Sequence, residues 1–520
     1  MINRKLLTIG AGFTLAIATA ACNSDKLTNL NANPNSPEDV PAGPLFTYAT
    51  RLSVSRWLGS GYSLRQTEWL SQHLAQVQYN DEDRYLRLHG GDTEGSFNGA
   101  YSGELKDLTQ IITKGTAAGE AGTYGPALVL RTWEFSYLTD SWGDIPYFDA
   151  LRGDSVGGSL APKYDMQKAI YADFFATLDK ATKDMASGSA SNTLGSADPI
   201  YAGDLVKWQK FSNSLRARLA LRIINVDPAT ANAQLTAAFN APGGVFQSNA
   251  DNAVFRWPGD GVNDNPWAVN FKTRDDHRMS NTIMGLLQGN SDPRLPIFAL
   301  PTTADPTKYA GSPNGISPAR AAAGNYIINA SRPGAIFYPG ATAYGTFGGA
   351  GSRYPSYVMT YADVAFIRAE AAQRGLGGLS AGQAAGFYNA AILASMAQWG
   401  VTTAAANTFL TGANVAYAGG TAGLTQIAQQ RWLALFTDGG QAWAEWRRTC
   451  QPATVKPGID ASRNVVPRRF EYPVLEYTVN EANVTAAATT QGGPDVYETR
   501  VYWDKSPTAA PTYVAGCGQR

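Results

Sequence analysis

The stretch that most constrains the fold is residues 426–448, QIAQQRWLALFTDGGQAWAEWRR, which predicts two helices joined by a tight turn. Leu424, Ile427 and Leu435 lie on one stripe of a 3.6-residue period, as in a helix with one buried face. The Asp-Gly-Gly run at 438–440 ends the first helix, because glycine adopts backbone angles that other residues avoid. A short connection makes neighbouring helices antiparallel, so we expect an αα-hairpin.

A second helix pair is predicted upstream. Residues 361–374 form an alanine-rich helical run that ends at a group of glycines, and residues 381–399 continue as another helix. Helix pairs of this size favour a mainly α fold in which tetratricopeptide-like pairs stack into a superhelix. An irregular all-α domain is the alternative, because the repeat pattern is degenerate.

Several other segments have helical periodicity. They are residues 45–58, 64–78, 101–114, 124–142, 164–185, 204–224 and 280–288. In the helix at 204–224 the basic residues Lys207, Lys210, Arg216 and Arg218 lie largely off the apolar stripe, so we expect them to form a solvated face.

The N-terminus predicts export and lipidation. Residues 1–21 combine the positive Arg4 and Lys5 with an apolar stretch at 6–17 and a small-residue cleavage region, and Cys22 follows directly. This order resembles the lipobox of bacterial lipoproteins, in which the cysteine thiol is diacylated. A plain secretory signal is the alternative. No later stretch is long and apolar enough to span a membrane.

Composition limits the class of partner. Charged residues make up 16% of the chain and aromatic residues 11%, and 42 basic residues balance 42 acidic ones. A neutral chain has no field that attracts a phosphate backbone, so nucleic-acid binding is excluded, and an extracytoplasmic carbohydrate- or peptide-contacting protein is favoured. In that compartment Cys450 and Cys517 either form a disulfide or remain free thiols.

Changes in character along the chain divide it into segments. Residues 22–43 are polar and proline-rich and read as a tether, and residues 44–240 are helical. Gly, Pro, Asn and Asp accumulate over 241–357, where periodicity fades but aromatic residues are frequent. We therefore expect a loop-rich ligand-binding subdomain there. Residues 358–520 return to helical hairpins and a tail, packing with 44–240 as one domain.

The loop-rich segment supplies two groups of candidate ligand-binding residues. Sugar recognition needs flat apolar faces beside polar groups, and peptide capture needs a concave surface with few polar anchors. The first group is Trp257, Asn265, Trp267, Arg274 and Asp275. For its two tryptophans, packing in the subdomain core is the alternative.

The second group of candidates lies in a glycine-rich loop and consists of Tyr338, Tyr344 and Phe347. Residues 259–265, GDGVNDN, place several oxygen ligands close together and can hold Ca²⁺, but they lack the EF-hand spacing and its terminal Glu. A polar turn is the alternative there, and we expect no other cofactor.

Several conspicuous aromatic and basic residues are predicted to be structural. Trp432, Trp443, Trp446, Arg447 and Arg448 lie in the two helices of the 426–448 hairpin. We expect them to pack in the core and to form ion pairs.

Six segments together resemble the SusD/RagB family of nutrient-binding outer-membrane lipoproteins. They are the lipobox, WQKFSNSLRARLALRI at 208–223, SDPRLPIFA at 291–299, YVMTYADVAFIRAEAA at 357–372, QRWLALFTDGGQAWAEWRRT at 430–449 and VPRRFEYPVLEYTVNEANV at 466–484. The resemblance implies a tetratricopeptide-like helical superhelix without catalysis. It also implies an outer-membrane lipoprotein that captures glycans or peptides and delivers them to a SusC-like TonB-dependent transporter.

Enzymatic motifs are missing from the sequence. Its three histidines and three cysteines have no zinc spacing, and neither G-x-S-x-G nor a phosphate-binding loop occurs. We therefore predict a non-enzyme. A glycan-cleaving enzyme needs only two well-placed carboxylates and stays open as an alternative, as does a purely structural surface lipoprotein.

Overall fold

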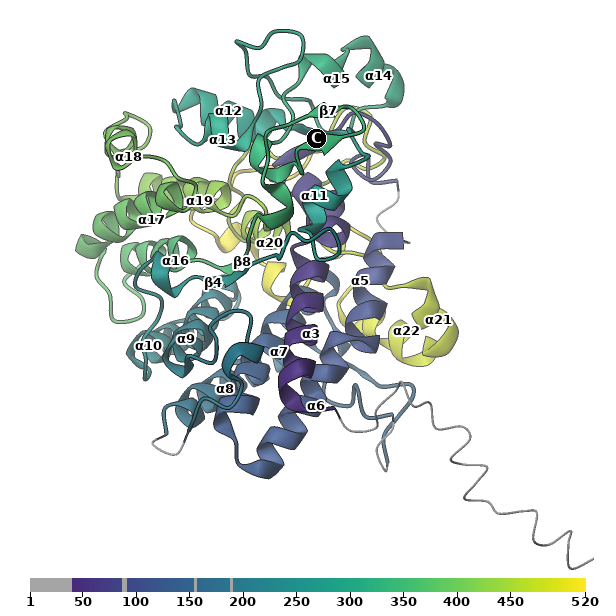
Figure 1. Cartoon of the computed structure of the whole chain (residues 1–520), viewed down its shortest axis with the longest axis vertical. Coiled ribbons are helices and arrows are strands. Elements are labelled where there is room, and N and C mark those ends of the chain that lie inside the picture. The colour runs from purple at the N-terminus through teal and green to yellow at the C-terminus, as the bar shows by residue number, and fades with distance from the viewer. Residues whose placement is uncertain (1–39, 87–90, 154–156, 188–189) are drawn as a thin grey trace, which may run out of the picture.

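The computed structural model describes residues 40–520 except 87–90, 154–156 and 188–189. Residues 1–39, which hold the predicted signal, Cys22 and most of the predicted tether, lie outside the described residues. The described chain is mainly helical, and its helices pack in antiparallel pairs, as the sequence predicts (Figure 1).

The N-terminal half is a row of helices in which each packs on the next. The row consists of α6 (Glu104–Ala118), α7 (Ala121–Trp142), α8 (Gln167–Met185), α9 (Leu205–Arg222) and α10 (Pro228–Asn240). α3 (Ala42–Trp57) crosses α6 and α7, and α5 (Gly91–Ser102) packs beside it. Because α7 is covered from several sides, nearly all of its residues are buried.

The C-terminal half has a second set of helix pairs. α16 (Tyr361–Gln373) packs on α17 (Ala384–Gln398) and α19 (Gly420–Ala434), and α19 packs on α20 (Gly439–Thr449). α16 also contacts α9, which joins the two halves. The remaining helices here are α18 (Thr403–Leu410), α21 (Val474–Val479) and α22 (Glu481–Thr490).

The predicted 426–448 hairpin is therefore present as α19 and α20, but its glycines have a different role from the one expected. Neither Gly439 nor Gly440 has a positive φ; the left-handed residue of this turn is Thr437. A Cβ on Gly440 would lie 2.7 Å from the Tyr62 ring and 2.9 Å from the Tyr137 ring. Glycine is required because α20 approaches its neighbours closely.

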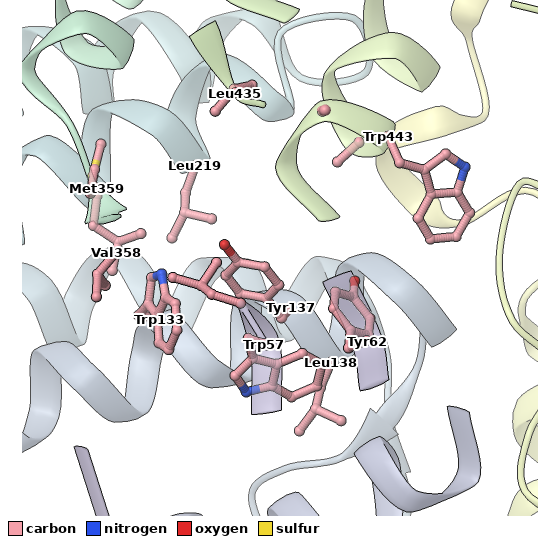
Figure 2. Packing of buried hydrophobic residues seen from close by; sticks show 14 of the residues in the cluster. Trp57, Tyr62, Trp133, Tyr137, Leu138, Leu219, Val358, Met359, Leu435 and Trp443 are labelled. Carbon is pink, nitrogen blue, oxygen red and sulfur yellow. The ribbon is translucent and has the colours of Figure 1, made fainter. Parts of the chain in front are cut away.

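Aromatic rings form the centre of the core between the two halves (Figure 2). The Trp57 ring centroid lies 4.8 Å from that of Tyr62 and 5.4 Å from that of Tyr137, and Trp133 lies 5.0 Å from Tyr137. These rings come from α3, α7 and the π-helix η1 (Ser60–Thr67). Offset and edge-to-face ring pairs of this kind stabilise a core beyond the area they bury.

A buried network of ion pairs joins α9, α16, α19 and α20. Asp363 accepts hydrogen bonds from Arg218 (2.8 Å) and Arg431 (2.7 Å), and Arg448 donates to Glu370 (2.8 Å). Burial raises the pKa of Asp363, but the two arginines outweigh burial and lower it to about 2. Arg448 and the tryptophans of the hairpin are buried, which confirms the predicted structural role.

The expected solvated face of α9 is wrong for two of its four basic residues, while the other two, Lys207 and Lys210, are half-buried. Arg216 and Arg218 are 6% and 2% exposed. Arg218 is covered because α16 packs on α9 and supplies Asp363 as its partner. The contact joins residues 145 positions apart, which helical periodicity does not reveal.

Residues 64–78 do not form the single helix that their periodicity predicts. They pass from η1 through α4 (Glu68–Leu70) into the strand β1 (Leu74–Gln76). Gln72, with φ of 62°, breaks the helical course, and β1 then pairs antiparallel with β5 (His277–Met279). A strand partner about two hundred residues away overrides local helical preference.

Residues 241–357 contain short elements that pack onto the helices. Their helices are α11 (Pro266–Phe271), α12 (Asn281–Gly289), α13 (Leu295–Phe298), α14 (Pro318–Ala323) and α15 (Tyr326–Asn329). The other strand pairs are β2 (Ile145–Pro146) with β3 (Tyr164–Asp165), β4 (Ala253–Phe255) with β8 (Ser356–Met359), and β6 (Ala341–Thr342) with β7 (Gly345–Thr346). The limits of the proposed subdomain stay a prediction.

A disulfide joins Cys450, at the end of α20, to Cys517 in the C-terminal tail. Backbone hydrogen bonds from Val466 to Gly518 (2.9 Å) and from Arg520 to Asn464 (3.0 Å) attach the same tail to the preceding segment. Among the helices of the described ranges, none combines the length and the apolar character needed to cross a bilayer.

Candidate functional site

The β1–β5 pair brings two distant loops together on one surface. Gln76 lies opposite His277, and the Val77 N–H donates to the Asp276 carbonyl (2.9 Å). The loop after β1 therefore runs beside residues 274–276, which precede β5. This places Tyr79 next to Arg274.

Tyr79 is held as an exposed aromatic platform. Its side chain is 71% exposed, and the Arg274 guanidinium carbon lies 4.9 Å from the ring centroid. Arg274 is itself fixed by two hydrogen bonds to Asp276 (3.1 and 2.7 Å). Tyr79 has a φ of 50°, a left-handed conformation that costs an aromatic residue roughly 1–2 kcal/mol. Strain of this kind is typical of sites where the backbone must present a particular side chain.

The β6–β7 hairpin adds two half-buried rings, Tyr344 and Phe347, next to the segment that leads into β5. The Ala343 N–H donates to the Lys272 carbonyl (2.8 Å), and the Tyr344 hydroxyl donates to the Phe271 carbonyl (2.7 Å). The hairpin is thus anchored on the residues just before Arg274. Beneath it, Tyr338 is buried and stacks between Phe271 and Phe347.

Arg332 links the hairpin to residues 274–276. Its guanidinium carbon lies 5.7 Å from the Tyr344 ring centroid and 5.9 Å from that of Phe347. It also donates to both carboxylate oxygens of Asp275 (2.6 and 2.7 Å). We call the group formed by Tyr79, Arg274, Asp275, Arg332, Tyr344 and Phe347 the Tyr79 surface.

The carboxylate of Asp276, which holds Arg274 in place, is kept ionised by its neighbours. Burial raises the pKa of Asp276, but His277 and Arg274 outweigh burial and hold that pKa well below its usual range. Burial also raises the pKa of the Tyr344 hydroxyl, which stays protonated as a donor. Asp275 is paired with Arg332 and Arg278. The surface therefore offers ring faces and guanidinium donors for binding, while its acids are already engaged.

The structure brings together Arg274, Asp275, Tyr344 and Phe347 from the two predicted groups, but it removes other candidates from the surface. Trp257 and Trp267 are 4% and 3% exposed. Their indole N–H groups donate to the Ser356 hydroxyl (2.9 Å) and the Leu58 carbonyl (3.1 Å). This corrects the expectation that the two tryptophans offer stacking faces, because both rings are packed and satisfied inside the core.

Two further candidates are also internal. Asn265 is 4% exposed and caps α11, accepting from the Trp267 N–H (2.8 Å) while its amide donates to the Tyr354 carbonyl (2.8 Å). Tyr338 is 1% exposed, so it supports the Tyr79 surface from below without being part of it.

Residues 259–265, considered above for Ca²⁺, form a polar turn in this structure. Asp260 accepts from the N–H groups of Val262 (2.9 Å) and Asn263 (2.7 Å). Asp264 is paired with Lys272 (2.9 Å). Within the described residues no cluster of three or more His, Cys, Asp or Glu side chains is arranged to hold a metal ion.

Three hollows lie outside the Tyr79 surface. One of about 860 Å³ lies between α5, α21 and the loop after β2, and one of about 670 Å³ lies between the end of α12 and α18. A third, of about 340 Å³, is lined by Asp92, whose pKa is raised by burial and lowered by Arg65 and Arg274.

Comparison with known proteins identifies the family. A family model described as "SusD-like_2: Starch-binding associating with outer membrane" matches residues 34–473. The chain belongs to this SusD-like family. No curated protein sequence matches it.

Solved SusD-like structures share the fold over nearly their full length. A chitin-binding protein is 26% identical, with a TM-score of 0.74, covering 89% of this chain and 100% of the other. A SusD homologue from Bacteroides uniformis is 25% identical, with a TM-score of 0.76 and coverage of 90% and 100%. A chitin-binding SusD homologue from Flavobacterium johnsoniae is 25% identical, with a TM-score of 0.75 and coverage of 90% and 98%.

Sequence reasoning about this SusD-like chain missed Tyr79 and Arg332. A signal for Tyr79 was present, because it is the aromatic residue of a polar run, QYNDEDR at 78–84, where no apolar stripe would bury it. Arg332 carried no such signal. Its role depends on contacts with Asp275 and the β6–β7 hairpin that only the fold creates.

Proposed function

We propose that this SusD-like protein is a non-catalytic surface lipoprotein that binds an oligomeric glycan and delivers it to a SusC-like TonB-dependent transporter. The observation that carries the proposal is the Tyr79 surface, built on a fold that matches the family along most of the chain. Two similar solved structures are of chitin-binding proteins, which makes oligomers of N-acetylglucosamine the first ligands to test and ranks a glycan above a peptide.

The chemistry of the Tyr79 surface suits a sugar chain. The C–H faces of a pyranose ring pack against exposed aromatic faces, and Tyr79 supplies one at 71% exposure. Arg274 and Arg332 can donate hydrogen bonds to ring hydroxyls or to an acetamido carbonyl. Since Asp276 and Asp275 already hold these arginines in place, the surface loses little side-chain entropy on binding.

We expect binding without cleavage because Asp275 and Asp276 are both paired with arginine. Glycoside hydrolysis needs one protonated and one ionised carboxyl group across the scissile bond. Asp275 and Asp276 both accept hydrogen bonds from arginine, so neither carboxylate is free to act on a substrate. His277 and Arg274 also hold the pKa of Asp276 well below its usual range. We therefore expect any oligosaccharide that binds to be recovered intact, and release of shorter products on chromatography would support the hydrolase alternative.

Anchoring and delivery complete the proposed role. Acylation of Cys22 would hold the protein at the outer membrane, with residues 22–43 as a tether, and several acyl chains suffice for stable attachment. Captured glycan would pass to the barrel by lid-like opening and closing on the transporter. Co-purification from native membranes should recover a TonB-dependent barrel; its consistent absence would favour a purely structural lipoprotein.

The binding test uses a matched pair of tyrosines. In a titration with chitohexaose, we expect Tyr79→Ala to weaken association about tenfold, the order of one lost stacking contact. Tyr48→Ala is the control, because Tyr48 is also exposed (50%) and also lies under an arginine, Arg51 at 5.6 Å, but on α3. Equal affinity of the two variants and wild type would refute the assigned site.

A further inference from the structure

A second polar hollow lies away from the Tyr79 surface. It has a volume of about 670 Å³, within the range of ligand sites in proteins, and lies between the C-terminal end of α12 and the segment around α18. α12 begins directly after β5 and spans nine residues, so its far end is roughly 13 Å from the strand beside the Tyr79 surface. In Figure 1, α12 and α18 lie well to the left of β7. We call this hollow the α12–α18 cleft.

One wall of the cleft is fixed by a buried ion pair. Residues 289–293 form this wall, and within them Asp292 is paired with the fully buried Arg294 (2.6 Å). Arg294 also donates to the Ser395 hydroxyl (3.0 Å) and to the Gln430 side-chain carbonyl (2.9 Å), which ties the wall to α17 and α19. Its guanidinium carbon lies 5.9 Å from the ring centroid of Phe409, which belongs to the opposite wall.

The opposite wall is held through its backbone. The Gln426 side-chain amide donates to the carbonyls of Asn414 (3.2 Å) and Ala416 (2.9 Å). The Tyr388 hydroxyl donates to the Val415 carbonyl (2.9 Å). Both walls are therefore positioned before a ligand arrives, which lowers the entropy lost on binding.

The polar groups that line the cleft are neutral. Its lining residues contain no ionisable side chain; they are Gly289, Asn290, Ser291, Pro293, Ala405, Thr408, Phe409, Thr411, Gly412, Ala413, Asn414 and Val415. Within the described part of the chain, the side chains of Asn290, Ser291 and Asn414 form no hydrogen bond, so two amides and a hydroxyl are free to pair with a ligand.

Two threonine hydroxyls extend this neutral donor and acceptor set. The hydroxyls of Thr408 and Thr411 donate to the carbonyls of Ala404 (3.1 Å) and Thr408 (2.8 Å), which leaves their oxygen lone pairs available. A charged ligand would lose hydration here without gaining an ionic partner, whereas hydroxyl and amide groups of an uncharged ligand would be matched. Pro293, which is half-buried, adds apolar contact for ring C–H groups.

We infer that the α12–α18 cleft is a second binding site, for a neutral hydroxyl- and amide-bearing oligosaccharide. Two contact sites on one protein raise the effective concentration of a long ligand at each of them. The choice of a glycan rests on the proposed function; the position of the site rests on the cleft itself.

The test separates the two sites. Chitohexaose and maltoheptaose are titrated into the Tyr79→Ala/Arg274→Ala protein, whose first site is disabled, with binding followed by saturation-transfer NMR and folding checked by thermal denaturation. We expect residual binding that falls about tenfold when Asn290→Ala and Asn414→Ala are added, the order expected for two lost hydrogen bonds. Asn407→Ala is the control, because Asn407 is an exposed amide of α18 outside the cleft, and it should leave the residual binding unchanged.

Each outcome has one meaning. Residual binding that depends on Asn290 and Asn414 supports the cleft, even if Tyr79→Ala alone has no effect and the proposed first site fails. Absence of residual binding overturns the cleft while leaving the Tyr79 surface intact. Residual binding that is equal in the cleft variant and in the Asn407→Ala control also overturns it.

Discussion

Trp257 and Tyr79 differ in how their rings are held. Trp257 is 4% exposed and its N–H is satisfied by Ser356, whereas Tyr79 is 71% exposed and has Arg274 against its ring. The sequence favoured Trp257, because an aromatic ring beside Asn, Asp and Arg in an irregular segment suits sugar recognition. In the structure Tyr79, not Trp257, is the exposed ring. The strand pair β4–β8 lies in the buried region of Trp257, while the loop after β1 of the β1–β5 pair lies at the surface.

Asp438 is a buried residue whose charge depends on pH. Asp438 caps α20, accepting from the Gln441 N–H (3.2 Å) and from the Tyr137 hydroxyl (2.9 and 2.8 Å). Burial raises the pKa of Asp438 from 3.8 to about 7, despite the opposing effect of Arg218. The folded state therefore keeps a proton that the unfolded chain releases, and this group's contribution to the free energy of unfolding falls as pH rises from about 4 to 7.

Asp438→Asn tests this pH dependence, because asparagine can cap the helix without ionising. We expect the free energy of unfolding of the variant, relative to wild type, to increase by about 2 kcal/mol between pH 5 and pH 8 in denaturant titrations. Asp179→Asn is the control. Although burial raises the pKa of Asp179, Lys183 and Arg216 outweigh it and lower that pKa, so the control difference should stay flat over this range. A flat difference for Asp438→Asn would contradict the assignment.

At the scale of elements, local sequence predicted the helices that bury a single stripe and missed the contacts that cross the chain. The predicted ranges 124–142 and 164–185 match α7 and α8 closely, because their apolar residues repeat with the helical period and glycine or a polar run ends them. Residues 64–78 were predicted as one helix and are not, because β5 recruits Leu74–Gln76 as a strand. Arg218 was predicted to be exposed and is buried, because α16, from a distant part of the chain, covers it.

The approach of α20 to its neighbours gives a prediction for one glycine. Gly440→Ala would put a Cβ 2.7 Å from the Tyr62 ring and 2.9 Å from the Tyr137 ring, and overpacking of this kind costs about 1–3 kcal/mol. Gly386→Ala in α17 is the control, because nothing lies within 4 Å of its Cβ position and alanine favours a helix interior by up to about 1 kcal/mol. Denaturant midpoints should move in opposite directions; a stabilising Gly440→Ala would contradict the close packing of α20.

For the whole molecule, the mainly helical fold and the family followed from ordered motifs spread along the chain, and the family match confirms both. The candidate site was only partly predictable. Arg274, Asp275, Tyr344 and Phe347 were chosen from one irregular segment, but Tyr79 comes from the N-terminal half. A site assembled from two distant segments has no single stretch of sequence that encodes it.

The Cys450–Cys517 disulfide joins the C-terminal tail to the end of α20. Replacing both cysteines by serine should lower the free energy of unfolding by about 2–4 kcal/mol, because the unfolded chain regains the freedom that the crosslink removes. Chemical denaturation of wild type with and without reductant measures the same quantity, and the Cys450→Ser/Cys517→Ser variant should not respond to reductant. Identical curves for oxidised wild type and the variant would contradict a stabilising crosslink.

The most direct measurement of the central claim is the experimental structure of the protein with chitohexaose bound. We predict an intact oligosaccharide with a pyranose ring packed on Tyr79 and its polar groups within hydrogen-bonding distance of Arg274 or Arg332. Bound sugar found only elsewhere, with the Tyr79 surface bare, would contradict the account.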